Sequence, residues 1–162
     1  MKIRAAAAGD HDAIWRMLEP VFRAGDTYAV DPAISREAAL DYWFSGRVYV
    51  VEAEGAALGT FYIRANQAGG GAHVCNCGYI TARGAEGKGV ARAMLAFSLE
   101  EAKALGFVAM QYNFVLASNV RAVATWERAG FEVIGRIPRA FRFQDGTYTD
   151  ALVMHRFLWA NG

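Results

Sequence analysis

The glycine-rich stretch at residues 83–92 has the composition of an anion-binding loop. A predicted strand at residues 73–80 leads into Gly84, Gly87 and Gly89, and a helix is expected to begin at the last of these glycines. The first turn of a helix carries unpaired backbone N–H groups and a partial positive charge. Because glycines let the backbone approach a ligand closely, the stretch predicts a site for a phosphate-like group.

Two common phosphate-binding motifs do not fit this spacing. A P-loop needs G-x-x-x-x-G-K-[ST], and Lys88 is followed by Gly89 rather than by Ser or Thr. A dinucleotide-binding loop needs G-x-G-x-x-G, and Arg92 stands where the third glycine belongs. The loop therefore belongs to another class of anion site.

Three asparagines could bind or orient a substrate. Asn76 and Asn113 lie in predicted strands with apolar neighbours, which is a place that asparagine avoids. An unpaired buried amide costs about 1–3 kcal/mol, so we interpret both as candidate catalytic residues. The alternative is that each amide bonds to loop backbone or to a buried water. Asn119 precedes a predicted helix and is expected to cap it or to bind a ligand nearby.

His73, Cys75 and Cys77 form an H-x-C-x-C pattern. A structural zinc site normally uses a wider cysteine spacing and four ligands. Side chains at positions i and i+2 of a strand share a face but rarely reach disulfide geometry. We therefore expect two reduced, buried cysteines and no metal.

Hydrophobic periodicity and turn residues indicate the elements that position these groups. We predict strands at residues 2–8, 48–53, 58–64, 73–80, 107–115, 131–134 and 148–158, with a polar, aromatic excursion at 138–146. We predict four helices, with Asp10, Ser35, Gly89 and Asn119 at their starts and Gly25, Gly46, Gly106 and Gly130 at their ends. This order of elements predicts an α+β fold with a mixed, mainly antiparallel sheet.

The composition is that of a globular chain forming one domain over residues 1–162. The sequence is 54% hydrophobic and 13% aromatic, which favours a packed core over disorder. The net charge of +1 gives no basis for binding nucleic acid or anionic membrane. No stretch approaches the roughly 18 apolar residues of a membrane span, and the apolar run after Arg4 is too short for a signal peptide. We expect a cytoplasmic protein.

Two motifs resemble the GNAT superfamily of N-acetyltransferases. The run from Glu86 to Ala91 resembles its acyl-CoA loop, Arg/Gln-x-x-Gly-x-Gly/Ala, with Glu86 at the Arg/Gln position. The run from Asn119 to Phe131 resembles its C-terminal motif, Asn-x-x-Ala-x-x-x-Tyr-x-x-x-Gly-Phe, with Trp126 at the tyrosine position. The resemblance covers residues 73–135 well and implies the GNAT fold, with acetyl-CoA as the acyl donor.

The resemblance also implies a set of cofactor-binding residues. The strands at 73–80 and 107–115 should splay apart and hold the pantetheine arm. The arm would form hydrogen bonds with the backbone of Gly78, Tyr79, Ile80 and Thr81. Tyrosine at the position of Trp126 protonates the leaving thiolate in many members, and indole has no useful acidity, so the usual general acid is missing. The remaining implied contacts are Glu86, Gly87, Lys88, Gly89, Val90, Ala91, Arg92, Asn119 and Trp126.

The sequence resembles azetidine-2-carboxylate and phosphinothricin acetyltransferases within this superfamily. We therefore expect acetyl transfer to the amine of a small amino or imino acid, by direct attack in a ternary complex. Asn76, Asn113 and Tyr28 would bind the substrate, and a carboxylate on it would bind Arg64, Arg139, Arg142 or Tyr28. Alternatives are a protein or peptide N-acetyltransferase and a non-catalytic acyl-CoA-binding module. Exposed aromatic residues at 141–148 suggest a homodimer.

Overall fold

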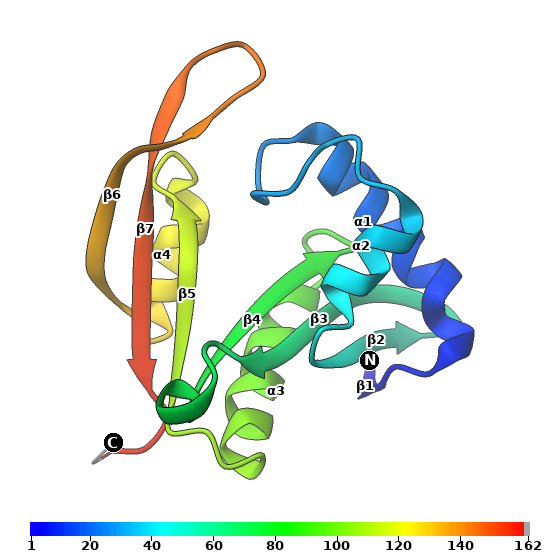
Figure 1. Cartoon of the computed structure of the whole chain (residues 1–162). Coiled ribbons are helices and arrows are strands. Elements are labelled where there is room, and N and C mark those ends of the chain that lie inside the picture. The colour runs from blue at the N-terminus through cyan, green and yellow to red at the C-terminus, as the bar shows by residue number, and fades with distance from the viewer. Residues whose placement is uncertain (161–162) are drawn as a thin grey trace.

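The computed structural model describes residues 1–160, and the helices and strands follow one another in the predicted order (Figure 1). The strands are β1 (Lys2–Ala5), β2 (Arg47–Ala53), β3 (Ala56–Ala65), β4 (Val74–Thr81), β5 (Ala109–Leu116), β6 (Glu132–Arg142) and β7 (Tyr148–Phe157). The helices are α1 (His11–Ala24), α2 (Arg36–Trp43), α3 (Val90–Ala104) and α4 (Val120–Arg128), with short 3-10 turns η1 (Ala8–Asp10) and η2 (Gly69–Gly71).

The seven strands form one mixed sheet in the order β1-β2-β3-β4-β5-β7-β6. Every neighbouring pair is antiparallel except β4 and β5, which are parallel. The predicted α+β class and the mainly antiparallel sheet are therefore confirmed. No helix within residues 1–160 combines the length and the apolar composition that a membrane crossing needs.

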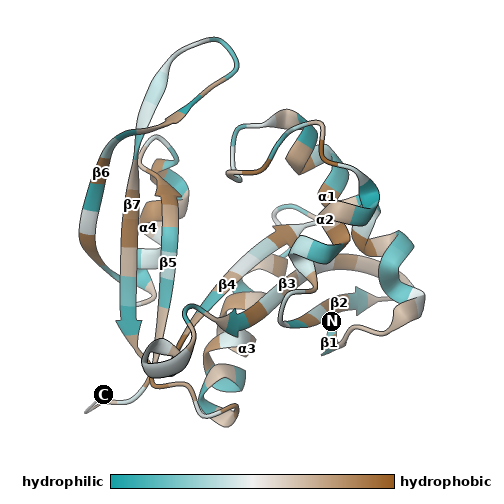
Figure 2. Ribbon diagram, in the orientation of Figure 1, coloured by the Kyte–Doolittle hydropathy of each residue, from teal (hydrophilic) through white to brown (hydrophobic). Residues whose placement is uncertain are grey.

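Helices cover both faces of the sheet. Residues Ile14, Phe22 and Trp43 of α1 and α2 form one buried cluster with β2 and β3. Met94 of α3 and Trp126 of α4 belong to a second cluster, which packs on the opposite side of the strands. Figure 2 shows that β6, at the edge of the sheet, instead alternates between hydrophobic and hydrophilic stretches.

Three predicted helix ends and turns are present in the structure. Ser35 caps α2 by accepting a hydrogen bond from the Ala38 N–H at 3.1 Å. Glu54 and Gly55 have φ of 51° and 77°, which is the left-handed conformation of a tight hairpin turn. Gly25 ends α1 in the same left-handed region, at φ 64°.

Asp10 stands at the start of α1 but does not cap it. Its carboxylate accepts hydrogen bonds from the Arg4 guanidinium at 2.8 Å and from the Ala7 N–H at 2.7 Å. The bond from Arg4 is the main reason that the pKa of Asp10 falls to about 2. Because Ala8 to Asp10 form a 3-10 turn, β1 ends at Ala5 rather than at residue 8.

The predicted excursion at 138–146 is mostly strand. β6 continues to Arg142 and pairs with β7, with a register irregularity between Ile137 and Phe141. Pro138 is tolerated there because β6 is an edge strand. Of the aromatic residues at 141–148, Phe141 and Phe143 are half-buried and Tyr148 is exposed, and β6 adds the exposed apolar residues Val133, Ile134 and Ile137. The homodimer stays a prediction.

A buried hydrogen bond holds α2 on the sheet. The Trp43 indole N–H donates to Thr60 Oγ1 at 3.1 Å, and the Thr60 hydroxyl donates to the Tyr49 carbonyl at 2.9 Å. Trp43 and Thr60 are both fully buried. Thr60 therefore satisfies a polar group at the centre of an apolar cluster.

Thr60→Val should leave the Trp43 indole N–H without its partner. We expect the free energy of unfolding to fall by about 1–3 kcal/mol, measured by urea denaturation. Thr60→Ser keeps the hydroxyl and serves as the matched control. Equal stabilities of the Val and Ser variants would show that this bond contributes nothing.

Candidate active site

β4 and β5 separate soon after they meet. Their parallel pairing consists of Val74 with Ala109 and Cys75 with Met110. Beyond these pairs the two strands diverge, as Figure 1 shows, and the sheet opens into a wedge. The splaying implied by the sequence resemblance is therefore present.

The even-numbered residues of β4 direct their backbone groups to β3. The Ala82 N–H donates to the Leu58 carbonyl at 2.8 Å. In the same strand pairing, Ile80 lies opposite Thr60. In an antiparallel pair such hydrogen-bonded positions recur at every second residue. Gly78 and Ile80 thus bond to β3, which corrects the expectation that their backbone would pair with the pantetheine arm.

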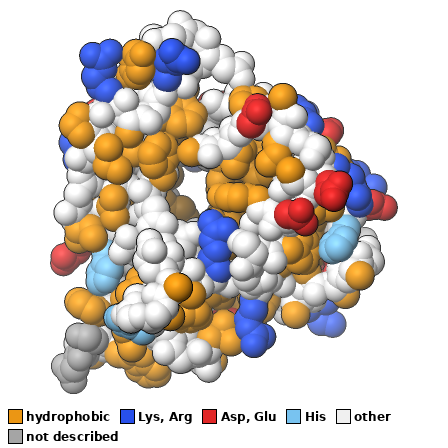
Figure 3. All heavy atoms as spheres, in the orientation of Figure 1, with side chains coloured by type: hydrophobic (Ala, Val, Ile, Leu, Met, Phe, Trp, Pro, Cys, Tyr) orange, Lys and Arg blue, Asp and Glu red, His pale blue; other side chains and the backbone are white. Residues whose placement is uncertain are grey.

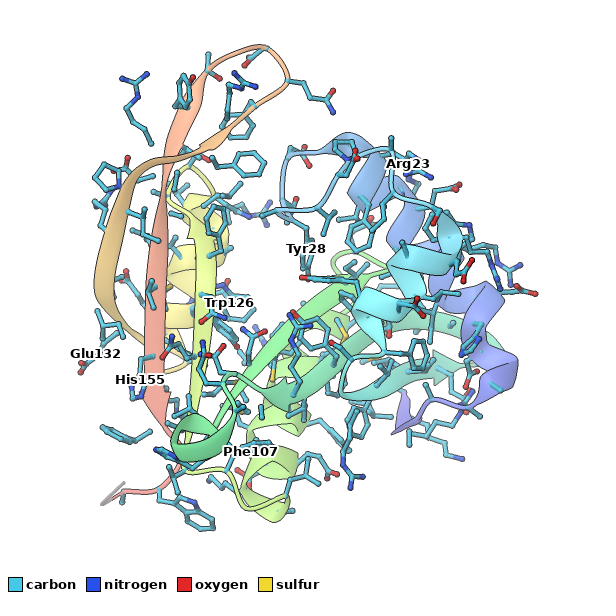
Figure 4. All side chains as sticks on the ribbon, in the orientation of Figure 1. Arg23, Tyr28, Phe107, Trp126, Glu132 and His155 are labelled. Atoms are coloured by element: carbon cyan, nitrogen blue, oxygen red, sulfur yellow. The ribbon has the colours of Figure 1, made fainter. Side chains whose placement is uncertain are left out.

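The odd-numbered residues Cys77, Tyr79 and Thr81 direct their backbone groups into the wedge instead. One of these groups has a partner from another element, since the Tyr28 hydroxyl donates to the Tyr79 carbonyl at 3.0 Å. Tyr28 comes from the loop between α1 and α2, and the bond ties this loop to β4. Figure 4 shows Tyr28 and Trp126 on opposite sides of the opening.

Asn76 joins the two strands where the ladder stops. Its Nδ2 donates to the Gln111 carbonyl on β5 at 2.9 Å, and its Oδ1 accepts from the Tyr62 hydroxyl at 3.2 Å. Arg64 in turn donates to the Tyr62 hydroxyl oxygen at 3.2 Å. The Asn76 amide is 6% exposed, and both of its polar atoms have protein partners.

Asn113 differs from Asn76 because it is exposed, which corrects the expectation of a buried amide. The pairing of β5 with β7 shifts register between Tyr112 and Val115, so Asn113 lies outside the regular ladder. Its Nδ2 donates to Asn66 Oδ1 at 2.6 Å, and its Oδ1 accepts from Gln111 Nε2 at 3.0 Å. The bulge turns this amide towards the cavity that it lines.

A cavity of about 420 Å³ runs through the wedge and has walls from both faces of the sheet. Figure 3 shows the opening between the two halves of the molecule. Its wall towards α1 and α2 includes Tyr28, Tyr42, Tyr62 and Arg64. Its wall towards α3 and α4 includes Ala91, Met94, Tyr112, Asn119, Ala122 and Trp126. This volume suits a small molecule.

Arg64 is the charged side chain of the cavity wall. Its guanidinium lies 4.3 Å from the centre of the Tyr62 ring and 5.2 Å from that of Tyr42, and it donates to Ser45 Oγ at 2.6 Å. Within residues 1–160 no carboxylate forms an ion pair with it. Burial raises the pKa of Tyr28 and of Tyr62, so these hydroxyls stay neutral beside it.

The glycine-rich loop is open to a ligand. Gly87 and Gly89 have φ of 75° and 81°, and no atom lies within 4 Å of the position that a Cβ would occupy on either. Glu86 folds back and accepts a hydrogen bond from the Gly84 N–H at 2.7 Å. Val90 buries its side chain, so only its backbone faces the loop.

The other sequence candidates lie away from the cavity or are inert. Arg139 stacks 4.5 Å from the centre of the Tyr148 ring, and neither Arg139 nor Arg142 lines the cavity. Cys75 and Cys77 are free and buried, and burial raises the pKa of the Cys77 thiol. In the part of the chain that the structure describes, no cluster of three or more His, Cys, Asp or Glu residues could hold a metal.

Three residues of the site were not predicted. Tyr42 and Tyr62 frame Arg64, and Tyr112 lines the cavity opposite them. The spacing of Tyr62 and Arg64, two residues apart on one strand, places both on the same face. That alternation could have identified the pair, whereas nothing local marks Tyr112.

Comparison with known proteins agrees with this geometry. Residues 12–131 match the acetyltransferase (GNAT) family. The N-acetyltransferase aca1 of Schizosaccharomyces pombe is 30% identical over 148 residues, which cover 80% of this chain and 71% of aca1. A GCN5-related N-acetyltransferase from Kribbella flavida is 38% identical, with a TM-score of 0.90 and 96% of each chain covered.

A phosphinothricin acetyltransferase from Sinorhizobium meliloti, solved in complex with acetyl-CoA, shares the fold. Its identity is 22% and its TM-score 0.84, with 96% of this chain and 87% of that chain covered. The chain therefore belongs to the acetyltransferase (GNAT) family. It is an acetyl-CoA-dependent N-acetyltransferase, and the alternative of a non-catalytic acyl-CoA-binding module is set aside.

The two asparagines should respond differently to substitution. Asn76→Leu leaves the Gln111 carbonyl without its donor and the Tyr62 hydroxyl proton without its acceptor, so we expect a loss of about 1–3 kcal/mol in the free energy of unfolding. Asn113→Ala removes an exposed amide and should leave stability unchanged while it lowers kcat more than it raises KM. Denaturation and steady-state kinetics check both. An unchanged kcat would exclude Asn113 from catalysis.

Proposed function

We propose that this N-acetyltransferase acts on the amine of a small amino or imino acid, by direct attack in a ternary complex. The observation that carries the proposal is Arg64, a cation without a carboxylate partner among residues 1–160, in the wall of a cavity that is otherwise uncharged. A half-buried cation of this kind favours a ligand that brings its own anion. An amino acid brings a carboxylate together with an amine.

The residues present fit acetyl-CoA on the other side of the wedge. The N-terminus of α3 offers unpaired N–H groups and a positive dipole end to a diphosphate, and the space around Gly87 and Gly89 is open. We assign this contact to residues 86–92, with Lys88 and Arg92 as exposed cations. The bound donor supplies a thioester, whose acyl carbon is activated for attack by an amine.

The middle of the wedge would hold the pantetheine arm. The backbone groups of Tyr79 and Thr81 point into it, and Asn119 and Trp126 line its opposite wall. Asn119 also caps α4 by accepting from the Ala122 N–H at 3.2 Å. In our proposal the Tyr79 N–H stabilises negative charge on the carbonyl oxygen as the amine attacks.

On the acceptor side, Arg64 would bind the carboxylate and Asn113 would orient the nitrogen. Tyr28 closes the same wall from the α1–α2 loop. An α-amine with a pKa of about 8 is partly neutral at pH 7 and needs no strong base, whereas the more basic amine of a cyclic imino acid needs more help to lose its proton. Asn76, whose amide is already bonded, then acts by holding β5 and Tyr62 in position.

A contact between the β6–β7 hairpin and the α1–α2 loop favours a small acceptor over a peptide. The tip of the β6–β7 hairpin lies against the α1–α2 loop, because Gln144 Nε2 is 2.7 Å from the position of a Cβ on Gly25. Pro32 lies beside the same position, at 3.1 Å. In our proposal this contact limits the access of a peptide to the cavity, whose wall includes Tyr28 of the same loop.

Release of CoA from acetyl-CoA, followed with a thiol reagent, tests the acceptor class. The panel contains azetidine-2-carboxylate, proline, phosphinothricin and a short peptide. We expect turnover with at least one of the small acids and none with the peptide. Turnover of the peptide alone would overturn the proposal, as would no turnover at all by a protein whose melting temperature acetyl-CoA still raises.

Arg64→Gln should weaken binding of acidic acceptors selectively. Loss of a charged hydrogen bond of about 1.5–3 kcal/mol corresponds to a rise in KM of roughly 10- to 100-fold for the acid that is turned over. The matched control is the same amine without its carboxylate, for example pyrrolidine against proline, whose KM should not change. Equal changes for both amines would remove Arg64 from carboxylate binding.

A further inference from the structure

Three hydroxyl groups form a chain beneath Trp126. The Tyr112 and Tyr79 hydroxyl oxygens are 3.0 Å apart, and the Tyr79 hydroxyl is 2.7 Å from Ser98 Oγ. Ser98 Oγ donates to the Leu95 carbonyl at 2.9 Å, within the same helix. The chain therefore crosses the wedge, from β5 through β4 to α3.

The order of donors in this chain follows from counting protons. A hydroxyl has one proton to donate, and that of Ser98 goes to the Leu95 carbonyl, so Tyr79 donates to Ser98. The Tyr79 proton is then committed, so Tyr112 donates to Tyr79. Tyr112 is thus the first donor of the chain; among residues 1–160 its oxygen accepts no hydrogen bond, and the residue lines the cavity.

Tyr112 lies beside Trp126, the residue that replaces the tyrosine of the C-terminal motif. Its ring is 4.8 Å from that of Trp126 and stacks 4.4 Å from that of Phe131, measured between ring centres. Trp126 occupies the family's tyrosine position, and indole cannot give up a proton usefully. A phenol therefore stands beside the residue that lacks the required chemistry.

The other tyrosines outside this chain, Tyr28, Tyr42 and Tyr62, lie in the opposite wall of the cavity. The Tyr28 hydroxyl donates to the Tyr79 carbonyl, and the Tyr62 hydroxyl donates to Asn76. Both belong to the wall towards α1 and α2, away from Trp126. The Cys77 thiol is buried and lies within the core cluster.

We propose that Tyr112 is the proton-transfer residue of the acetyl transfer. As the nitrogen attacks and the carbon–sulfur bond breaks, the Tyr112 O–H turns from Tyr79 to the departing sulfur and gives it the proton, while the Tyr79 O–H turns from Ser98 to the Tyr112 oxygen. The Tyr112 oxygen then takes the proton that the attacking nitrogen loses as the carbon–nitrogen bond forms. The proton lost by nitrogen is thus balanced by the one gained by sulfur, and Tyr112 ends as it began. The inference rests on the family's reaction and not on the class of acceptor.

Tyr79 would stabilise the transient Tyr112 phenolate. Burial raises the pKa of Tyr112 well above its usual value, which keeps the hydroxyl protonated until it acts, while the hydrogen bond with Tyr79 works in the opposite direction. If the Tyr79 hydroxyl turns from Ser98 to Tyr112, it donates to the oxygen that has become negative. Tyr79 is therefore a positioning residue for Tyr112.

Tyr112→Phe tests the proposal, because it removes one oxygen and keeps the packed ring. General acid catalysis contributes roughly 100- to 10,000-fold, so we expect kcat to fall at least 100-fold, with unchanged affinity for acetyl-CoA. Tyr49→Phe is the matched control, since Tyr49 is a buried tyrosine of the same core cluster, bonded to Glu101 outside the cavity. Its kcat should equal that of the wild type.

Two further measurements separate proton transfer from packing. Adding Trp126→Tyr to Tyr112→Phe supplies a phenol at the motif position and should restore part of the lost kcat. Ultraviolet absorbance of the thiolate of enzyme-bound CoA, followed against pH, needs no acceptor. A hydroxyl that donates to sulfur lowers the pKa of the bound thiol, so this pKa should rise in Tyr112→Phe and not in Tyr49→Phe.

The outcomes are decisive in either direction. A wild-type kcat in Tyr112→Phe, or a bound-thiol pKa that does not change, would overturn the role of Tyr112. Neither result would affect the acceptor proposal, which depends on the substrate panel. Failure of the whole acceptor panel would in turn leave the bound-thiol measurement intact.

Discussion

The unfinished pairing of β4 with β5 is the constraint on which the site depends. A sheet satisfies its backbone groups through neighbouring strands, and a buried strand without a neighbour would leave polar groups unpaired. Here the ladder stops after two residue pairs, and the Asn76 side chain makes the next connection in place of the backbone. Beyond it the odd-numbered backbone groups of β4 face the wedge, where the Tyr79 carbonyl bonds to Tyr28 and the remaining groups can bind an extended ligand. One interruption thus creates both the cavity and the polar edge that lines it.

The charges around this opening are few and separated. The N-terminal end of α3 lies at one mouth, and Arg64 lies in the opposite wall, held between two tyrosine rings. The tyrosines between them are neutral, because burial raises the pKa of Tyr28, Tyr62 and Tyr112. In such surroundings each positive group acts over a longer range than it would in water. In the proposed function an anion would bind at each end of the cavity, and the acetyl group would be transferred in its uncharged centre.

The sequence predicts what depends on neighbouring residues and misses what depends on distant ones. The caps at Ser35 and Asn119 and the turn at Glu54 follow from short-range hydrogen bonds and backbone preferences, so they were predictable. Asp10 looks like a cap by the same rules, yet Arg4 competes for its carboxylate from a neighbouring strand. Asn113 is exposed because of a bulge that forms only when β5 meets β7. The family motifs located the wedge, but strand register determines which backbone groups face it.

The hydrogen bonds that run from Arg64 through Tyr62 and Asn76 to the carbonyl on β5 connect the two binding regions. Each hydrogen bond in this series orients the donor of the next one. The guanidinium of Arg64 therefore helps to orient the Asn76 side chain, which joins β4 to β5. A carboxylate that orders Arg64 therefore also stiffens the joint that sets the width of the wedge. Thermodynamic linkage makes such coupling reciprocal. If bound acceptor raises the affinity for the acyl donor by some factor, bound acyl donor raises the affinity for the acceptor by the same factor. If Arg64 binds the acceptor as proposed, coupling between the two substrates would pass through the same side chains that hold the sheet together.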